Sequence, residues 1–303
     1  MDDRTEIFEA TRPRLFGLAY RMLGSVSDAQ DAVQDTYLKW VTYEGPTIAT
    51  PAAWLSRACT NGCLDRLKAA HRTRVDYVGP WIPDQIQTDH VPGPEAQAEI
   101  ASSLTTAFLL LLERLTPKER AAYLLHDIFC MPFDEVATVL ELQPANCRKL
   151  AARARDCVMQ GQVRYVPDEQ RQLVLLAAFR SALETGNTDA LAIALRADAN
   201  LRADSGGKAV AVREIIAGAS QICQFVTEIL SPAWQGMRIT TRTINGMPGL
   251  LIQNDTKLHA AISFAYDTAG QASEVFILRN PDKLDQIGNT RSSAAAAGTL
   301  WMH

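Results

Sequence analysis

The chain has 303 residues, of which 47% are hydrophobic, and its formal net charge is −4. This length allows two or three domains of ordinary size, each with its own apolar core. Residues 1–9 carry charges of both signs rather than the apolar core of a signal peptide, and no apolar run is long enough for a membrane span. We therefore expect a cytoplasmic protein that makes no membrane contact.

The six cysteines are scattered along the chain. Cys59 and Cys63 have the i, i+4 spacing of one helix face, but no second pair or nearby histidine completes a zinc site. We expect reduced thiols, and no metal or cofactor.

Charge is distributed unevenly in the first half of the chain. In residues 57–74, Asp65 is the only acid among several basic residues. In residues 144–164, Asp156 is the only acid among several basic residues. Between them, residues 77–103 contain four acids and no Lys or Arg. Two basic segments flanking an acidic one predict two separate DNA contacts, although solvated helix faces would give the same pattern.

Apolar periodicity predicts two helices between Phe8 and Tyr43, broken near Gly24, with Ser27 as the N-cap of the second. A third helix is expected from Pro51 to about His71. Prolines and glycines in residues 77–94 predict a linker. Helices are then expected from about Glu95 to Leu115 and, with Thr116 as N-cap, from Pro117 to Phe129.

Residues 131–156 have the pattern of a helix-turn-helix. A short helix over 133–140 is followed by a turn at 141–143, and Pro144 opens a second helix. The second helix would enter the major groove, where Arg and Asn side chains recognise base edges and other basic groups hold phosphates. The predicted DNA-reading residues are Asn146, Arg148, Lys149 and Arg153. A plain helical hairpin is the alternative for this segment taken alone.

Beyond Pro167 the pattern changes from helical, to about Leu195, to alternating β-branched runs. Strands are expected at 237–244, 249–253, 258–266 and 273–278, separated by turns such as Asn245-Gly246. Helices followed by an antiparallel meander indicate an α+β domain. The tail, residues 287–303, is expected to be disordered.

Several of these segments resemble a known family. Leu115–Arg120, Phe133–Ala137 and Arg148–Leu150 are similar to region 4 of the extracytoplasmic-function (ECF) sigma factors of the sigma-70 family, whose helix-turn-helix reads the −35 promoter element. The chain departs from the family at Glu141, where Gly is usual, and at Gln143, where Ser is usual.

Residues 28–40 and 54–67 resemble region 2 of the same family. The resemblance implies that the helix over 28–40 binds the clamp coiled coil of core RNA polymerase and that the following segment opens DNA at the −10 element. The polymerase-binding residues would be Asp31, Gln34, Asp35 and Lys39. The −10 residues would be Asn61, beside a flipped base, and Arg57, Arg66, Lys68, Arg72 and Arg74, on phosphates.

Three short motifs resemble a subgroup with a SnoaL-like domain after the sigma part: residues 77–83, 204–208 and 280–284. In this subgroup the extension modulates the sigma core, so these motifs are expected to meet at one regulatory seam. Its expected members are Tyr77, Pro80, Trp81, Asp204, Gly206, Gly207, Lys208, Asn280, Pro281, Asp282 and Lys283.

Together the resemblances imply a multidomain protein, two all-α sigma domains followed by an α+β SnoaL/NTF2-like domain. The expected boundaries are 1–76 for region 2, 77–100 for a linker, 101–165 for region 4 and 168–286 for the SnoaL-like domain. The expected partners are core RNA polymerase, through its clamp coiled coil and flap, promoter DNA, and an unknown small ligand of the C-terminal pocket.

Two other functions fit parts of the sequence. A ligand-sensing helix-turn-helix regulator that does not bind core polymerase would explain residues 131–156 and the C-terminal domain. It would leave the helix over 28–40 and the basic residues of 57–74 without a role. A pocket enzyme would need an organised acid or base, for which the candidates are Asp204, Arg242, Asp255 and Tyr266, but no carboxylate pair has a matched spacing along one strand. We therefore expect no catalytic residues.

Overall fold

The computed structural model describes residues 3–74, 77–89, 103–161 and 166–287. The chain forms two compact units. The first contains residues 1–76 and 109–161, and the second contains residues 77–108 together with the C-terminal domain. Each unit is described by itself.

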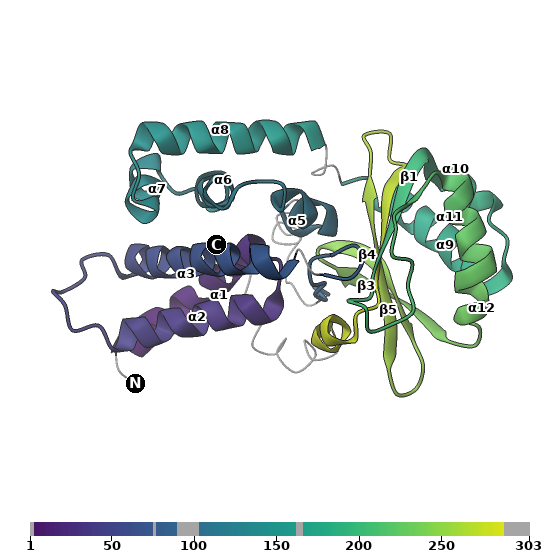
Figure 1. Cartoon of the computed structure of the whole chain (residues 1–303), viewed down its shortest axis with the longest axis horizontal. Helices are drawn as coiled ribbons and strands as arrows, with labels where there is room; N and C mark the ends of the chain where they lie inside the picture. Colours follow the sequence, from purple (N-terminus) through teal and green to yellow (C-terminus); the bar gives the residue numbers. More distant parts are fainter. Residues whose placement is uncertain (1–2, 75–76, 90–102, 162–165, 288–303) are drawn as a thin grey trace. The chain divides into compact units, whose positions relative to one another are not determined.

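Three long helices open the first unit: α1 (Asp3–Leu23), α2 (Val26–Val41) and α3 (Pro51–Arg74) (Figure 1). Their buried faces meet in a core that includes Leu15, Val33 and Leu55. The N-cap of α2 is Ser25, whose hydroxyl accepts a 3.3 Å hydrogen bond from the amide of Asp28. The predicted cap, Ser27, was wrong because Ser25 already has extended backbone angles and the helix starts directly after it.

The rest of the first unit is also helical. Its elements are α5 (Thr106–Leu112, shared with the second unit), α6 (Pro117–Tyr123), the π-helical turn η1 (Leu124–Ile128), α7 (Phe133–Leu140) and α8 (Pro144–Gly161). Thr116 caps α6 through a capping box with Glu119, as its sequence predicts. The first part of the helix expected from Glu95, residues 95–102, lies outside the described residues.

The second unit is built on one six-stranded sheet. Its strands are β1 (Leu195–Asp204), β2 (Ile216–Ala217), β3 (Arg238–Ile244), β4 (Met247–Gln253), β5 (Leu258–Tyr266) and β6 (Ala272–Leu278). The strand order is β2-β1-β6-β5-β4-β3, and only the β1–β6 pair is parallel. The turn Asn245-Gly246 joins β3 to β4 with both residues at positive φ, as expected.

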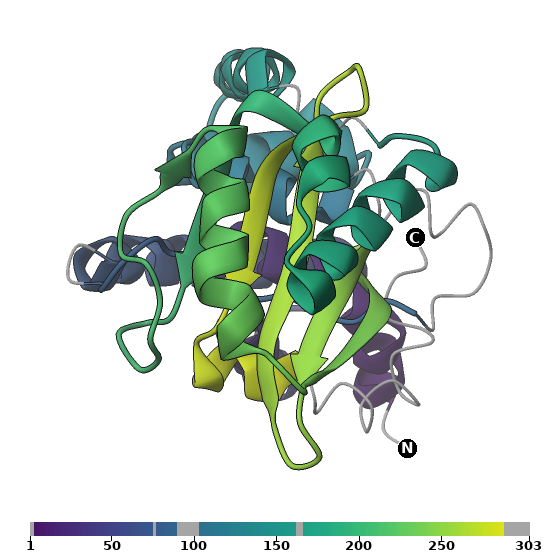
Figure 2. The same cartoon turned by 90° about the vertical axis from the view of Figure 1, so that its right-hand side faces the viewer.

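Helices cover one face of this sheet (Figure 2). They are α9 (Glu169–Thr185), α10 (Asp189–Ala194), α11 (Ala219–Phe225), the π-helical turn η2 (Val226–Leu230) and α12 (Ser231–Ala233). Phe179 of α9 meets Phe264 of β5 at 5.4 Å between ring centroids, within the larger core of the unit.

The opposite face has a smaller core around Ile244, Leu251 and Leu284. It is covered by the helical residues 281–287 and by residues 77–89, hereafter the linker segment. The order of domains expected from the sequence, helical domains followed by an α+β domain, is confirmed. Strands β1 and β2 and helices α11 and α12 were missed. The tail expected to be disordered lies outside the described residues, apart from Ile287.

Candidate nucleic-acid interface and the Asp204 cluster

Helix α8 has a buried apolar stripe on one side and an exposed polar face on the other. Cys147, Ala151, Ala154 and Val158 are buried at helical spacing and fix the side of α8 that faces the core. The four predicted DNA-reading residues, Asn146, Arg148, Lys149 and Arg153, are all exposed. The guanidinium of Arg148 lies 5.5 Å from the ring centroid of Phe133, which orients it. The helix therefore offers a basic face without a hydrophobic covering.

The turn before α8 is tight. Glu141, the residue after α7, has φ 54° and ψ 47°, in the left-handed region that non-glycine residues rarely adopt. The amide of Leu142 donates to the carbonyl of Ala137 at 3.0 Å, which closes the end of α7. The side chain of Glu141 extends to Arg57 of α3, with 2.6 Å between the carboxylate and the guanidinium.

Helix α2 presents the predicted polymerase-binding residues on its exposed face. Asp31, Gln34, Asp35 and Lys39 are all exposed, while the opposite face is buried. Leu38 lies among them with 51% of its surface exposed. Sequence analysis missed Leu38 because its spacing alone does not distinguish it from a core residue.

The predicted −10 residues lie on α3. Arg66 binds Asp35 of α2 at 2.6 Å, and Lys68 binds Asp65 at 3.0 Å. Asn61 is partly buried, and the side chains of Arg72 and Arg74 lie outside the described residues. Two of the predicted phosphate-binding arginines, Arg57 and Arg66, thus already hold carboxylates of this chain.

The second unit contains a group of polar contacts around one buried carboxylate, the Asp204 cluster, consisting of the side chains of Tyr77, Asp204, Asn280 and Lys283 and the backbone of Ile82. The carboxylate of Asp204 is fully buried and accepts from the Tyr77 hydroxyl at 2.6 Å, the Ile82 amide at 2.9 Å and the Lys283 ammonium at 2.8 Å. Asn280 donates to the Tyr77 hydroxyl at 3.0 Å. Burial, followed by the hydrogen bond to Asp204, raises the pKa of Tyr77 well above its usual value, so this phenol stays neutral.

Lys283 is held by more than its ion pair. It also donates to the Ile82 carbonyl, and its ammonium lies 4.7 Å from the ring centroid of Trp81 and 5.4 Å from that of Tyr77. These contacts explain the aromatic residues of the linker segment, because a partly desolvated ammonium is stabilised over aromatic rings. Asp84 of the linker segment is a more distant carboxylate, at 3.9 Å.

Two glycines allow the linker segment to approach. Gly206 and Gly207 have φ of 57° and 73°, and the amide of Gly206 donates to Asp204 at 3.0 Å. A Cβ on Gly206 would collide with the side chain of Asn280, and one on Gly207 would lie 3.2 Å from Val78. The motif 204–208 is therefore a turn whose two glycines leave space for residues 77 and 78.

The remaining seam residues lie around this cluster. Lys208 pairs with Asp282 at the surface. Pro281 begins the helical residues that carry Lys283, and Pro80 lies in the linker segment, partly buried. The structure thus brings all three motifs together.

The linker segment also bonds to the edge and face of the sheet. The Thr88 amide donates to the Thr243 carbonyl at 2.9 Å, the Ile86 amide donates to the Asn245 side chain at 2.9 Å, and Gln85 donates to Ser263 at 2.8 Å. The sequence predicts that residues 77–100 form a linker between domains. In the structure its described part, to Asp89, is folded into the second unit because these buried polar groups need its backbone.

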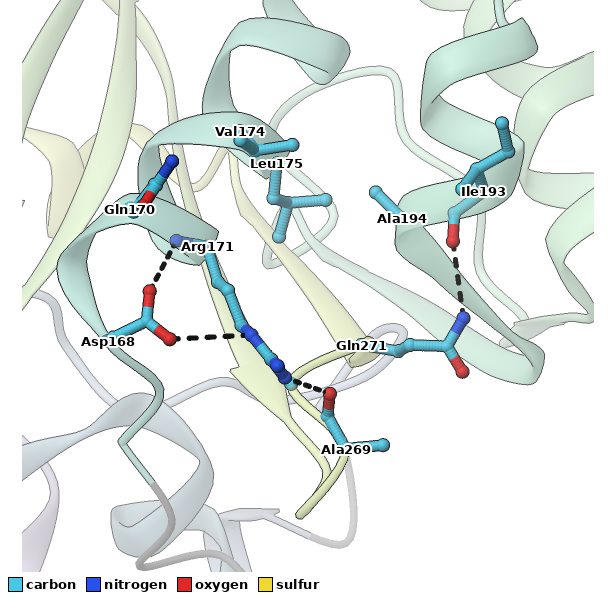
Figure 3. A pocket seen from close by; sticks show the side chains of 10 residues that line it. Asp168, Gln170, Arg171, Val174, Leu175, Ile193, Ala194, Ala269 and Gln271 are labelled. Carbon is cyan, nitrogen blue, oxygen red and sulfur yellow. Dashed lines mark hydrogen bonds and ion pairs between the residues drawn. The ribbon is translucent and has the colours of Figure 1, made fainter.

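A hollow of about 420 Å³ opens on the helix-covered side of the second unit (Figure 3). It lies between the start of α9, the end of α10 and the β5–β6 turn. Its lining is mixed, with apolar side chains from Val174, Leu175, Ile193 and Ala194 and polar ones from Asp168, Gln170, Arg171 and Gln271. Its polar groups bind one another: Arg171 contacts Asp168 and the Ala269 carbonyl, and Gln271 donates to the Ile193 carbonyl at 3.2 Å (Figure 3).

The comparisons with known proteins agree with this geometry. Residues 7–73 match sigma-70 region 2, and residues 105–158 match sigma-70 region 4. The ECF RNA polymerase sigma factor SigJ of Mycobacterium tuberculosis is 34% identical over 233 residues, which are 76% of this chain and 74% of SigJ. The chain belongs to the ECF RNA polymerase sigma factors.

Two further matches extend over nearly the whole sigma factor. The probable ECF sigma factor SigI of Mycobacterium tuberculosis is 26% identical, over 94% of this chain and 96% of SigI. The crystal structure of Mycobacterium tuberculosis SigJ has a TM-score of 0.69 and 29% identity, covering 93% of this chain and 98% of that one. The predicted family and the fused C-terminal domain are therefore confirmed, and the protein directs promoter recognition and transcription initiation.

The four residues considered for catalysis have separate structural roles or surroundings. Asp204 is occupied by four donors, and Asp255 is exposed and paired with Arg238. Arg242 donates to the neighbouring Thr241 carbonyl, and burial raises the pKa of Tyr266. Sigma factors are initiation factors rather than enzymes. Among the described residues, no group of His, Cys, Asp and Glu side chains could hold a metal ion, and no helix has the length and apolarity of a membrane span.

Proposed function

We propose that α8 reads the −35 element and α3 the −10 element while α2 binds core RNA polymerase. The observation that carries this proposal is the exposed face of α8, where Asn146, Lys149 and Arg153 recur at helical spacing opposite a fully buried stripe. A helix fixed in this way can enter a major groove without losing its own packing. Asn and Arg supply base-edge contacts, and Lys149 supplies a phosphate contact.

For polymerase binding, we propose the exposed face of α2 around Leu38. Asp31, Gln34, Asp35 and Lys39 surround this exposed leucine, so the face has an apolar centre and a charged rim. Stable protein interfaces commonly have this composition. The clamp coiled coil is the proposed partner of this face, and the flap is the proposed partner of the region 4 helices. The site of action would be the cytoplasm, where polymerase and chromosome meet.

We further propose that the C-terminal domain regulates initiation through the Asp204 cluster. The linker segment connects the two promoter-reading regions in sequence. The cluster holds it by two hydrogen bonds to the Asp204 carboxylate, from Tyr77 and from the Ile82 amide, and by the contacts of Lys283 with the Ile82 carbonyl and the rings of Tyr77 and Trp81. A domain that binds the connection between two DNA-reading regions can control how far they separate. Truncation near Pro281 would remove the buried Leu284 and Ile287 as well as Lys283, so point variants are the sharper test.

Transcription from a genomic promoter library by core polymerase tests the first proposals. The wild-type chain should direct initiation at defined sites, and Arg153→Ala should reduce it at those sites. Arg180→Ala, an exposed arginine of α9 paired with Glu184, is the matched control and should have no effect. A wild-type chain that never starts a transcript would contradict the proposed roles.

The regulatory proposal has its own matched pair of variants. Tyr77→Phe removes the hydroxyl that bonds Asp204, whereas Tyr266→Phe removes a buried hydroxyl of the same domain that has no partner among the described residues. Tyr77→Phe should change the transcription rate at equal polymerase binding, and Tyr266→Phe should not. Equal rates for Tyr77→Phe and the wild type would overturn this role of the cluster.

For the unknown small ligand, we propose the hollow beside α9 and α10. Its volume is within the range of small-molecule sites, and Val174 and Ile193 expose apolar surface there. Screening small apolar compounds by thermal shift, with Ala194→Trp to fill the hollow, tests this proposal. A ligand whose stabilising effect persists in Ala194→Trp would bind elsewhere.

A further inference from the structure

Several buried nitrogen atoms of the second unit have no hydrogen-bond partner among the described residues. They include Nε1 of Trp234, Nε of Arg279 and Nε2 of His259. Buried N–H groups are nearly always paired, because an unpaired one loses its bonds to water without replacement. Trp234 has only 3% of its surface exposed, so its indole N–H is enclosed. These three atoms therefore indicate a site for a hydrogen-bond acceptor.

The three residues lie at one end of the sheet. Arg279 directly follows β6, His259 is the second residue of β5, and Trp234 lies between α12 and β3. Strands β6, β5, β4 and β3 pair in antiparallel fashion, so the end of β6 and the starts of β5 and β3 are at the same end. The guanidinium carbon of Arg279 is 5.9 Å from the ring centroid of Trp234. The chain fold thus brings three distant segments to one place.

The positive charge of Arg279 has no carboxylate partner among the described residues. Burial lowers the pKa of Arg279, and burial followed by the charges of Lys257 and Arg279 lowers the pKa of His259. A partly desolvated guanidinium is costly unless an anion accompanies it. An anionic ligand would supply the missing counter-charge.

The hydrogen bonds of Arg279 show which edge of its guanidinium is available. Nη1 donates to the Val210 carbonyl, whereas neither Nε nor Nη2 has an acceptor among the described residues. Nε and Nη2 form an edge that binds both oxygens of a carboxylate in parallel. The indole N–H of Trp234 can only donate, and Nε2 of a neutral His259 donates when it holds the ring proton. This set of donors fits a planar carboxylate.

The group lies at the margin of the core and is reachable from solvent. Arg279 and His259 are partly exposed. Residues 209–212 pass beside them without regular structure, and Ala211 packs against the larger core. A small carboxylate has access beside these residues, whereas a bulky ligand would meet packed side chains. The hollow beside α9 and α10 is at the other end of β5, so the two sites are separate.

The backbone of Arg279 joins this group to the Asp204 cluster. The amides of Arg279 and Asn280 donate to the same Asp204 carbonyl, at 2.7 and 2.9 Å. The side chain of Arg279 extends to Trp234 in the helix-covered core. The side chain of Asn280 bonds the Tyr77 hydroxyl on the opposite face of the sheet. A ligand that moves Arg279 would therefore act on the backbone that positions Asn280.

We propose that Trp234, His259 and Arg279 form a binding site for a small carboxylate, and that its occupancy changes how the Asp204 cluster holds the linker segment. The binding site depends only on the three side chains and their surroundings. Its effect on transcription rests on the regulatory role proposed above for the cluster.

Binding is tested on the full-length chain with sodium acetate as the probe. Acetamide is the neutral molecule of the same shape, and sodium chloride keeps the ionic strength constant. The chain has five tryptophans, so its indole N–H signals in an NMR spectrum are few, and Trp234→Phe identifies the signal of Trp234. Acetate should shift this signal in a saturable way, and acetamide should not. Equal shifts with both, no shift with acetate, or tighter binding of inorganic phosphate would overturn the carboxylate site.

Variants of the arginine test its role directly. Arg279→Gln should weaken acetate binding about tenfold or more, as expected for a lost charged hydrogen-bond donor. Arg279→Lys retains the charge but not the planar edge, so it should also weaken binding, with less disturbance of the fold. Arg238→Gln is the control, because exposed Arg238 at the start of β3 already has Asp255 as its counter-ion at 3.0 Å. Equal affinities of the Arg279 variants and Arg238→Gln would contradict the assignment.

The same spectra test the link to the linker segment. The ring of Trp81 lies 4.7 Å from the Lys283 ammonium, so its indole signal reports on the Asp204 cluster. Acetate should shift the signals of Trp81 and Trp234 in parallel in the wild type, and neither in Arg279→Gln. A constant Trp81 signal beside a shifting Trp234 signal would overturn the link. Transcription by Tyr77→Phe tests the role of the cluster without any ligand, so failure of that role and failure of this site are distinguishable.

Discussion

The hydroxyl of Tyr77 donates a 2.6 Å hydrogen bond to the carboxylate of Asp204, a residue 127 positions later in the chain. This bond joins the start of the linker segment to the end of β1. Lys283 completes the arrangement from a third part of the sequence, with its ammonium 2.8 Å from the same carboxylate. A buried carboxylate with several donors is costly to form and costly to break, so its variants should have large effects.

Asp204→Asn should lower the free energy of unfolding by about 3 kcal/mol, because it removes the nearest counter-charge of the partly buried Lys283 and leaves only the more distant Asp84. Chemical denaturation of the full-length chain measures this loss. Adding Lys283→Met to Asp204→Asn should recover part of it. Asp282→Asn, which affects an exposed pair with Lys208, is the control and should cost at most about 0.5 kcal/mol. Similar losses for Asp204→Asn and Asp282→Asn would show that the cluster is not a stabilising unit.

Gly206→Ala should destabilise the second unit more than Gly236→Ala. Both glycines have positive φ, so both variants strain the backbone. Only the Gly206 variant would also place its Cβ against Asn280 and 3.2 Å from the Tyr77 hydroxyl, since Gly236 has open space around it. The difference in melting temperature between the two variants measures the destabilisation caused by the steric clash at Gly206. Equal melting temperatures would show that the linker segment is not held closely at this turn.

Lys149→Ala should weaken holoenzyme binding to all −35 sequences alike and reduce the salt dependence of binding by about one counterion. Arg153→Ala should instead weaken binding mainly to the preferred sequence, with a loss of about 1–3 kcal/mol. Titrations of promoter DNA over a salt series distinguish the two effects. A sequence-dependent loss in Lys149→Ala would assign it to base reading rather than phosphate contact.

Leu38→Asp should reduce the affinity for core polymerase by at least about tenfold, because an apolar centre of an interface commonly contributes more than 1 kcal/mol. Leu173→Asp is the control, since Leu173 on α9 has 49% of its surface exposed, close to the 51% of Leu38. Co-purification with core polymerase, followed by quantitative binding, measures both. Equal affinities would place the polymerase contact on another helix.

His259 of β5 should make stability depend on pH. Burial, followed by the positive charges of Lys257 and Arg279, lowers the pKa of His259 below its ordinary value of 6.5. The unfolded chain then binds a proton more readily than the folded chain, so stability falls as the pH decreases through this value. Denaturation at about pH 7.5 and about pH 5.5 should show a smaller decrease for His259→Gln than for the wild type. An equal decrease would mean that other groups dominate.

Local patterns predicted much of the helical half. The stripe of Cys147, Ala151 and Ala154 and the capping box of Thr116 depend on residues within one or two turns, so the sequence contains the whole signal. Strand β1 was missed although apolar and polar residues alternate along it, because its apolar positions are mostly alanine, which is depleted in strands. Its pairing with β6 stabilises it as a strand. The partners of Glu141 and Lys283 depend on contacts between distant segments, which spacing cannot specify.

The linker segment makes the second unit discontinuous in sequence: the chain enters it at Tyr77, leaves it after Phe108 and returns at Gln162. Ile82 and Ile86 of this segment are buried, with 0% and 4% of their surfaces exposed. A gene shortened after region 4 would therefore not encode a minimal two-region factor. It would encode a chain in which the apolar residues of the linker segment are exposed to solvent, and such chains tend to aggregate. Loss of the C-terminal domain during evolution would accordingly require the apolar residues of the linker segment to be replaced as well.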